Sequence, residues 1–178
     1  IFEGNLNINF QSTLNLLKVA KLYKIRKFIF ASTGNVYEPL FNNKKLLEKN
    51  NLNPISYYGR SKYISEQLIN YYSSEVDFII LRLFFPYGPG QSNRLISNLF
   101  TKIISKSPVM LNNNSGHVIT PTYINDVIKT LNYFINNDIK NNVYNVASNN
   151  SITLKKLCLM IGEVVNISPK FVYSSASK

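Results

Sequence analysis

Several residue types and patterns are scarce in this sequence. Its 178 residues include one cysteine, Cys158, which excludes an internal disulfide framework and suits a reducing, cytoplasmic environment. No apolar run approaches the ~20 residues that a membrane-spanning helix needs, so no membrane segment is predicted. Acidic residues are also few, with nine Asp and Glu against 20 Lys and Arg. The sequence opens on Ile1 without a methionine, and we expect the true N-terminus to lie upstream.

The formal net charge of +11 raises the question of a nucleic-acid partner. The lysines are spread along the chain, and no basic tract is longer than Lys44-Lys45 or Lys155-Lys156. We therefore interpret most of the charge as solvated surface, with a small share available to an anionic ligand, and expect no nucleic-acid binding. Hydrophobic residues make up 45% and aromatic residues 13% of the chain, which is typical of a globular protein with a sizeable core.

Apolar periodicity predicts alternating helices and strands, as in α/β proteins. Helices are expected near residues 9–23, 58–69, 95–104, 127–135 and 154–161, and strands near residues 28–31, 76–84, 109–111 and 143–146. Asp126 and Thr153 are predicted to cap the last two helices. Residues 39–53 have the composition of a surface loop, and residues 86–90 form a breaker that predicts a domain boundary. Cys158 lies among apolar residues and is expected in the core.

The segment of residues 54–62 contains the clearest candidate catalytic residues. Tyr58 precedes Lys62 by four residues at the start of a predicted helix, so both side chains lie on one helix face. Free tyrosine ionises only near pH ~10, but a neighbouring ammonium lowers the pKa of a phenol. Such a phenol can exchange a proton with a substrate hydroxyl or carbonyl. The alternative is an ordinary amphipathic helix start, because Tyr-x-x-x-Lys alone is a common pattern.

Thr33 lies where a predicted buried strand ends. Apolar residues 28–31 are followed by the small polar residues 32–35. Ligands of open α/β sheets bind outside the carboxyl ends of the strands, which makes Thr33 a candidate hydrogen-bond donor. A plain helix cap or turn residue is an equally good interpretation of this threonine.

Four segments, in one order, resemble the extended short-chain dehydrogenase/reductase family, the NAD-dependent epimerase/dehydratases. The segments are Asn9-x-x-x-Thr13, Ser32-Thr33-x-x-Val36-Tyr37, Pro54-x-Ser56-x-Tyr58-Gly59-x-Ser61-Lys62, and Arg82-Leu83-Phe84 followed by Tyr87-Gly88-Pro89-Gly90-Gln91. Residues 123–127 and 144–146 extend the similarity toward the C-terminus. Each segment alone is weak, but the ordered set covers nearly the whole chain and is highly specific.

The resemblance implies a fold and a division of the chain. The expected fold is α/β, a partial Rossmann-type doubly wound parallel sheet with a smaller C-terminal substrate-binding region. Residues 1–85 would form the C-terminal half of an NAD(P)-binding domain, and residues 86–178 a substrate-binding region that is incomplete at its C-terminus. The family carries a glycine-rich turn on its first strand, and neither Gly-x-x-Gly-x-x-Gly nor Gly-x-Gly-x-x-Gly occurs here. We therefore expect a fragment of a longer enzyme, inactive by itself.

The resemblance also implies roles for five residues. Tyr58 would be the catalytic acid/base, Lys62 would activate it and hold the nicotinamide ribose, and Thr33 would hydrogen-bond the reacting oxygen. Asn9 would order the active-site helix, and Phe84 would be a backbone neighbour of the nicotinamide. These five residues form the expected cofactor-binding set, for NAD or alternatively NADP. No metal site is expected, and the full-length protein is expected to be a homodimer.

The implied substrate is a nucleotide sugar, a sugar or a sugar-like alcohol. Phe85 stands where many sugar-nucleotide enzymes of the family have a phosphate-contacting asparagine, and residues 118–119 are apolar where those enzymes have an arginine. Arg94 and the general positive charge could compensate for both losses. His117, the only histidine, is interpreted either as a ligand contact or as an ordinary loop residue.

The expected reaction is hydride transfer, either an epimerisation through a bound keto intermediate or a net oxidation or reduction. The family's 4,6-dehydratases carry Asp-Glu after the strand-end threonine, where this chain has Gly34 and Asn35. Neither residue titrates near neutrality, and the nearest carboxylate, Glu38, lies on the far side of the turn. The alternative function is a non-catalytic Rossmann-fold binding module, either redox-sensing or nucleic-acid-associated. The retained tyrosine, lysine and threonine favour the enzyme.

Overall fold

The computed structural model describes residue 4, residues 6–38 and residues 45–174. Its chain divides into two compact units. The first comprises the chain up to Phe84 together with Val127–Val146, and the second comprises Phe85–Asp126 and the chain from Ala147 onward. The chain thus first leaves the first unit beside the boundary predicted after residue 85. Residues 127–146, which the sequence analysis placed in the second region, return to the first unit because their strand pairs with the sheet there.

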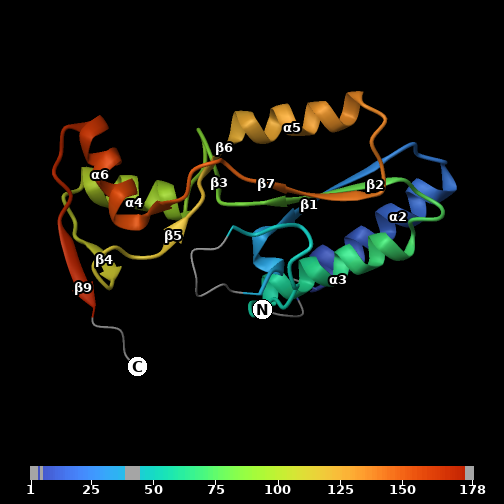
Figure 1. Ribbon diagram of the computed structural model, residues 1–178, viewed down its shortest axis with the longest axis horizontal. Helices are drawn as coiled ribbons and strands as arrows, with labels where there is room; N and C mark the ends of the chain where they lie inside the picture. The colour runs from blue at the N-terminus through green and yellow to red at the C-terminus, as the bar shows by residue number, and fades with distance from the viewer. Residues whose placement is uncertain (1–3, 5, 39–44, 175–178) are drawn as a thin grey trace. The chain divides into compact units, whose positions relative to one another are not determined.

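A three-stranded parallel sheet lies at the centre of the first unit (Figure 1). Strands β1 (Phe28–Thr33), β2 (Phe78–Leu83) and β7 (Asn142–Val146) pair in the order β1-β2-β7. The central strand β2 begins with four buried apolar residues, as expected for a parallel strand that is covered on both faces. The register aligns Ser32, Arg82 and Asn145 across the three strands, one residue before the strand ends.

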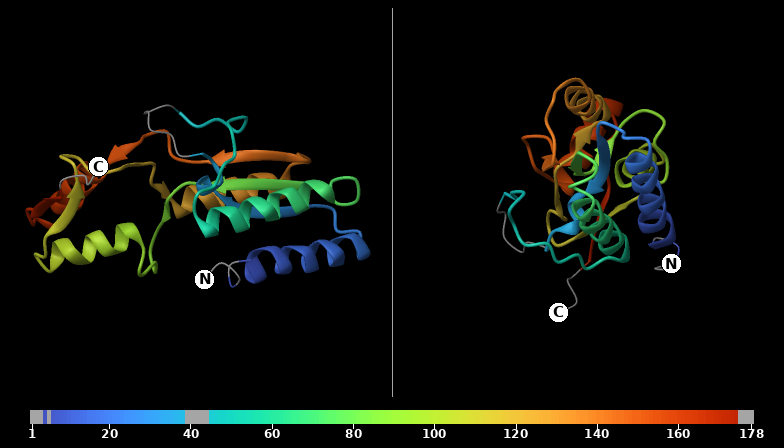
Figure 2. Two further views of the ribbon diagram at one scale, coloured as in Figure 1. Left: turned by 90° about the horizontal axis from the view of Figure 1, so that it is seen from below. Right: turned by 90° about the vertical axis from the view of Figure 1, so that its right-hand side faces the viewer.

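Helices cover both faces of this sheet. Helices α2 (Ser12–Leu22) and α3 (Tyr57–Tyr71) lie on one face, and α5 (Ile124–Asn136) lies on the other (Figures 1 and 2). Leu17 of α2 and Ile69 of α3 pack with buried residues of β1 and β2, and each such fully buried side chain contributes about 1.5–3 kcal/mol. On the opposite face, the Phe134 ring of α5 lies 4.6 Å from the Tyr144 ring of β7, between centroids. The predicted α/β fold with a doubly wound parallel sheet is confirmed.

The helix predicted from residue 9 begins with a π-helical turn, η1 (Asn7–Gln11), before α2. Helix α5 begins at Ile124, two residues before the predicted cap. Asp126 lies in its first turn and is not its N-cap, so that prediction was wrong. A carboxylate in the first turn still interacts favourably with the partial positive charge of a helix N-terminus.

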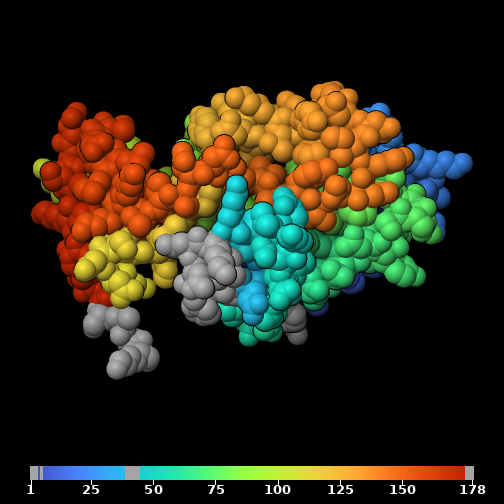
Figure 3. Space-filling view, in the orientation of Figure 1, coloured from blue at the N-terminus to red at the C-terminus, as the bar shows by residue number. Residues whose placement is uncertain are grey.

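Of the predicted surface loop, residues 39–44 lie outside the described residues. Its remaining part, residues 45–53, lies at the surface beside β7 (Figure 3). Asn145 of β7 contacts this segment twice: its backbone N–H donates to Glu48 Oε1 at 2.8 Å, and its side-chain amide donates to the Leu46 carbonyl at 3.2 Å. The loop is therefore held against the sheet by hydrogen bonds.

The second unit has a separate core. Helices α4 (Leu95–Ile104) and α6 (Leu154–Val165) pack with the parallel pair β4 (Val109–Asn112) and β9 (Phe171–Ser174). Two short pairs complete the unit: β3 (Pro86–Tyr87) with β6 (Thr122–Tyr123), and β5 (Val118–Ile119) with β8 (Ile152–Thr153). Strands β5 and β6 lie within residues 118–124, which the sequence predicts to be extended with an interruption at Pro121. Within the described residues, no helix is long and apolar enough to cross a membrane.

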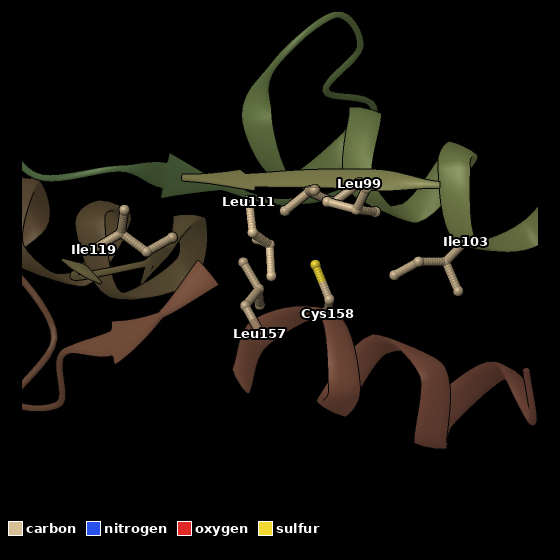
Figure 4. Close-up of a cluster of buried hydrophobic side chains, with 7 residues drawn as sticks. Leu99, Ile103, Leu111, Ile119, Leu157 and Cys158 are labelled. Carbon is tan, nitrogen blue, oxygen red and sulfur yellow. The ribbon is translucent and has the colours of Figure 1, made fainter. Parts of the chain in front are cut away.

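Helix α6 supplies much of that core. Leu157 and Cys158 point from α6 toward side chains of α4 and β4 (Figure 4). Cys158 is fully buried, which confirms its predicted core position, and burial raises the pKa of its thiol. Thr153 caps α6 as predicted, because its Oγ1 accepts a hydrogen bond from the Lys156 backbone N–H at 3.2 Å. The helix ends at the left-handed backbone of Asn166, with φ 55°.

Candidate active site

The first turn of α3 carries Tyr58. The helix begins after Ser56, whose extended backbone and side chain form an N-cap: its Oγ accepts a hydrogen bond from the Gly59 backbone N–H at 3.0 Å. Tyr58 therefore lies at the helix start, as its motif predicted. Tyr58 is 41% exposed, so part of this residue is open to solvent.

Helix α3 begins in close contact with the turn that follows β1. This turn, η2 (Gly34–Val36), is capped by Thr33, whose Oγ1 accepts a hydrogen bond from the Asn35 backbone N–H at 3.2 Å. A Cβ atom on Gly59 would lie only 2.4 Å from the Asn35 carbonyl oxygen, so the approach requires glycine. Thr33 and Tyr58 consequently lie on the two sides of one tight contact. A threonine hydroxyl that accepts one bond can still donate its own hydrogen to a ligand.

Lys62 extends from α3 onto β1. Its Nζ donates to the Ala31 carbonyl at 2.9 Å and lies 4.5 Å from the centroid of the Phe30 ring. Burial disfavours the charged form and lowers the pKa of this ammonium below its ordinary value. Because Ala31 precedes Thr33 by two residues, Lys62 and Thr33 are held at the same end of β1.

Asn9 reaches α3 through Ser61. The Asn9 side-chain amide donates to Ser61 Oγ at 2.9 Å, and Ser61 Oγ donates to the Tyr58 carbonyl at 2.9 Å. The Asn9 carbonyl in turn accepts from Thr13 Oγ1 at 2.6 Å, which ties Asn9 in η1 to the first turn of α2. These bonds link the helix before β1 to the helical turn that carries Tyr58. Ser61 belongs to the sequence motif, but its bridging position is visible only in the structure.

Phe84 closes the end of β2. Its backbone N–H donates to the Val146 carbonyl at 3.0 Å, and its ring lies 6.2 Å from the Tyr37 ring, between centroids. A Cβ atom on Gly34 would lie 2.6 Å from a carbon of the Phe84 ring. Position 34 therefore has no room for a side chain unless this ring moves.

All five residues of the expected cofactor-binding set lie in the first unit. Tyr58 and Lys62 belong to α3, Asn9 is bonded to α3 through Ser61, Thr33 ends β1, and Phe84 follows β2. The remaining candidates from the sequence lie in the second unit. Phe85 has a left-handed backbone, with φ 39°, and its ring is 44% exposed. Arg94 precedes α4, and His117 is exposed with its carbonyl bound to the Leu154 backbone N–H. Their ligand roles stay predictions. The described residues contain no cluster of three His, Cys, Asp or Glu side chains that could hold a metal ion.

Comparison with known proteins gives related sequences and a closely similar fold. UDP-glucuronic acid decarboxylase 1 of Arabidopsis thaliana is 30% identical over 169 residues, covering 90% of this chain and 38% of that protein. The dTDP-D-glucose 4,6-dehydratase of Dictyostelium discoideum is 28% identical over 158 residues, covering 82% and 36%. The crystal structure of UDP-glucuronic acid 4-epimerase from Bacillus cereus in complex with NAD matches with a TM-score of 0.85 at 25% identity, covering 94% of this chain and 56% of that one.

These matches confirm the predicted Rossmann-like fold. The chain spans 36% to 57% of the length of the curated relatives it matches. The sequence profile of the NAD dependent epimerase/dehydratase family matches residues 3–147, which is most of the chain. This span includes the strand end at Thr33 and all of α3. The chain belongs to the NAD dependent epimerase/dehydratase family.

Proposed function

We propose that the full-length protein catalyses NAD-dependent hydride transfer at a hydroxyl-bearing carbon of a nucleotide sugar or related sugar alcohol. The product would be an epimer or a net oxidised or reduced sugar. One observation carries this proposal: Tyr58 and Lys62 lie one turn apart on α3, and the start of α3 contacts the turn capped by Thr33. The three relatives described above carry out three different reactions, so the reaction type must be argued from the residues of this chain.

Three side chains supply the proton chemistry in this proposal. Tyr58 accepts the proton of the substrate hydroxyl, and it returns a proton when the carbonyl is reduced. The positive charge of Lys62 favours the ionised phenol, because an opposite charge nearby stabilises the charged form. The Thr33 hydroxyl donates a hydrogen bond to the same substrate oxygen, which becomes more negative as its proton leaves.

The residues present fit a nicotinamide nucleotide at this strand end. In open α/β sheets, such ligands lie outside the carboxyl ends of the strands, where Lys62 and the Phe84 backbone are found. Among the described residues, Lys62 Nζ donates to a single acceptor, the Ala31 carbonyl, so an ammonium with three N–H groups retains donors for ribose hydroxyls. Asn9 would contribute by holding α3 in place. When bound, NAD accepts a hydride from the substrate carbon and can return it.

Turnover by the full-length protein tests the proposal. NAD would be incubated with UDP-glucose, UDP-glucuronic acid and unphosphorylated hexoses, with proton NMR to detect epimers and absorbance at 340 nm to detect net redox. Tyr58→Phe should retain NAD binding and lose about 10²–10⁴-fold in turnover, because it removes the proton-transfer group. Tyr71→Phe is the matched control, since it removes a tyrosine hydroxyl at the far end of the same helix, where Tyr71 is 82% exposed, and should leave turnover unchanged.

Two results would contradict this function. Equal turnover by Tyr58→Phe and the wild type would remove Tyr58 from the mechanism. NAD binding by a wild-type protein that converts none of these sugars would instead support the non-catalytic binding module.

A second copy of the protein is the expected macromolecular partner. On α2 and its C-cap residue, Leu16, Val19 and Tyr23 are 57%, 49% and 70% exposed. Their spacing places them along one helix face, as required for packing against another element. The exposed apolar face supports a homodimer of the full-length protein that uses α2.

A further inference from the structure

A row of polar side chains crosses the sheet of the first unit near its carboxyl end. The row consists of Ser32 of β1, Arg82 of β2 and Asn145 of β7, which the strand register places side by side. Ser32 and Arg82 are 3% and 4% exposed. Each member of the row is the next-to-last residue of its strand, so Ser32 directly precedes Thr33. None of its members has a role in the proposed proton transfer.

Arg82 binds three different elements from within this row. Its Nε and Nη2 donate to the carboxylate of Glu66 on α3, with Nη2 at 2.7 Å from Oε2. Its Nη1 donates to the Tyr37 hydroxyl at 2.8 Å and to the Glu48 carbonyl at 3.2 Å. Ser32 also donates to Glu66. Although burial opposes its charge, the bonds and attraction of Glu66 raise the pKa of Arg82, so the guanidinium stays charged.

The bonds extend from Arg82 to the segment of residues 46–48. The Tyr37 hydroxyl, which accepts from Arg82, donates to Asn145 Oδ1 at 2.7 Å. Asn145 in turn holds both Leu46 and Glu48, through the two hydrogen bonds described above. The segment that leads into the N-cap of α3 is thereby fixed to the sheet from two neighbouring strands.

Stability alone does not account for this arrangement. A buried ion pair can often be replaced by apolar residues without loss of stability, so the pair of Arg82 with Glu66 is weak evidence for a stabilising role. An apolar pair could not supply the branch through Nη1 that holds Tyr37 and Glu48. That branch is directional, and it connects the segments on both sides of the candidate active site.

Two of the three candidate catalytic residues lie close in sequence to a member of this network. Thr33 follows Ser32 directly, and Lys62 lies one helical turn before Glu66. We propose that Arg82 is a positioning residue, whose guanidinium holds α3 and residues 46–48 at fixed places relative to the Thr33 strand end. The catalytic meaning of this role rests on the function proposed above, whereas the holding of the segment does not.

Two variants of the full-length protein test the role. Arg82→Lys keeps a positive charge beside Glu66 but loses the planar fork that bridges to Tyr37 and Glu48. Tyr37→Phe removes one hydroxyl and leaves the ion pair intact. Ile80→Val is the matched control, because it weakens the buried core of the same strand without touching the network. Hydrogen–deuterium exchange of residues 45–58, melting temperature, kcat and KM would be measured for all four proteins.

We expect both network variants to exchange severalfold faster over residues 45–58 than Ile80→Val does at a comparable melting temperature. Their kcat should fall by about 10- to 100-fold, with KM nearly unchanged, because a shift of about 1 Å in catalytic groups has that effect. Exchange no faster than in Ile80→Val would overturn the proposal, and so would faster exchange with unchanged kcat. Absence of turnover in the wild type would refute the proposed function instead, and the exchange comparison would still decide whether Arg82 holds the segment.

Discussion

Replacing Gly59 by alanine is the most direct test of how the structure brings Tyr58 to Thr33. The added Cβ would lie 2.4 Å from the Asn35 carbonyl oxygen, 0.6 Å inside the 3.0 Å that real Cβ contacts keep. The opposing atom belongs to the backbone of the η2 turn, so rotation of a side chain cannot relieve the clash. Helix α3 and the turn that carries Thr33 must therefore move apart.

The size of this separation sets the expected loss of activity. A misplacement of about 1 Å can reduce catalysis by about 10²-fold, so a shift of at least 0.6 Å should lower kcat by roughly 10- to 100-fold. That range corresponds to about 1.4–2.7 kcal/mol in the activation free energy. The effect on stability should be smaller. Alanine ordinarily stabilises a helix by about 1 kcal/mol relative to glycine, which offsets part of the ~1–3 kcal/mol cost of overpacking.

The assay compares kcat, KM and melting temperature of the full-length wild type, Gly59→Ala and a control. Gln67→Ala is a suitable control because it introduces alanine at an exposed position of the same helix. We expect kcat to fall in Gly59→Ala alone, with a melting temperature close to that of the wild type. A Gly59→Ala protein with wild-type kcat would refute the argument that this contact sets the geometry of the site.

Two further predictions concern charge and assembly. Burial lowers the pKa of Lys62 in the folded state below the unfolded value of ~10.4. Between these two pKa values the unfolded chain binds more protons than the folded chain, so the free energy of unfolding rises with pH in this window. The free energy of unfolding of the wild type, measured with urea, should therefore increase relative to Lys62→Met as the pH approaches 10. A difference that stays constant with pH would contradict the effect of partial burial on this ammonium. Leu16→Glu should convert a dimer of the full-length protein into monomer in light scattering, whereas Lys18→Glu, at an exposed polar position of α2, should not; a Leu16→Glu dimer would exclude this face.

Local pattern was sufficient to predict the elements of the first unit but not their grouping. The apolar run of residues 78–81 predicted a buried strand, because a parallel strand covered on both faces needs apolar residues at every position. The strand β7 was also predicted. Its place beside β2 was not, because pairing between residues so far apart in sequence leaves no local signal. Residues 127–146 were for this reason assigned to the second region, although they complete the sheet of the first.

The candidate site shows the same difference between local and long-range information. Tyr58 and Lys62 could be predicted from spacing within one helix, whereas the N-cap role of Ser56 was found in the structure. Arg82 carried a usable signal, since a charged residue inside a buried strand requires a partner. Its partner Glu66 could not be selected from nine acidic residues without the packing of α3 on the sheet.

The structure also bears on whether the full-length protein eliminates water from its substrate. Elimination beside a transient ketone needs a second acid/base group, and this chain has Gly34 and Asn35 where the family's 4,6-dehydratases carry Asp-Glu. The Phe84 ring fills the space that a side chain at position 34 would occupy. Position 34 therefore leaves no open space in which a carboxylate could be restored without moving this ring. We therefore expect no 4-keto-6-deoxy product from NAD and nucleotide hexoses, as judged by proton NMR of the C6 methyl group. Gly34→Asp should not create that activity, because the carboxylate would have to displace the Phe84 ring. Formation of a 4-keto-6-deoxy sugar by the wild type at an enzymatic rate would refute this reasoning and require another acid, for which Glu38 is the nearest carboxylate in the sequence.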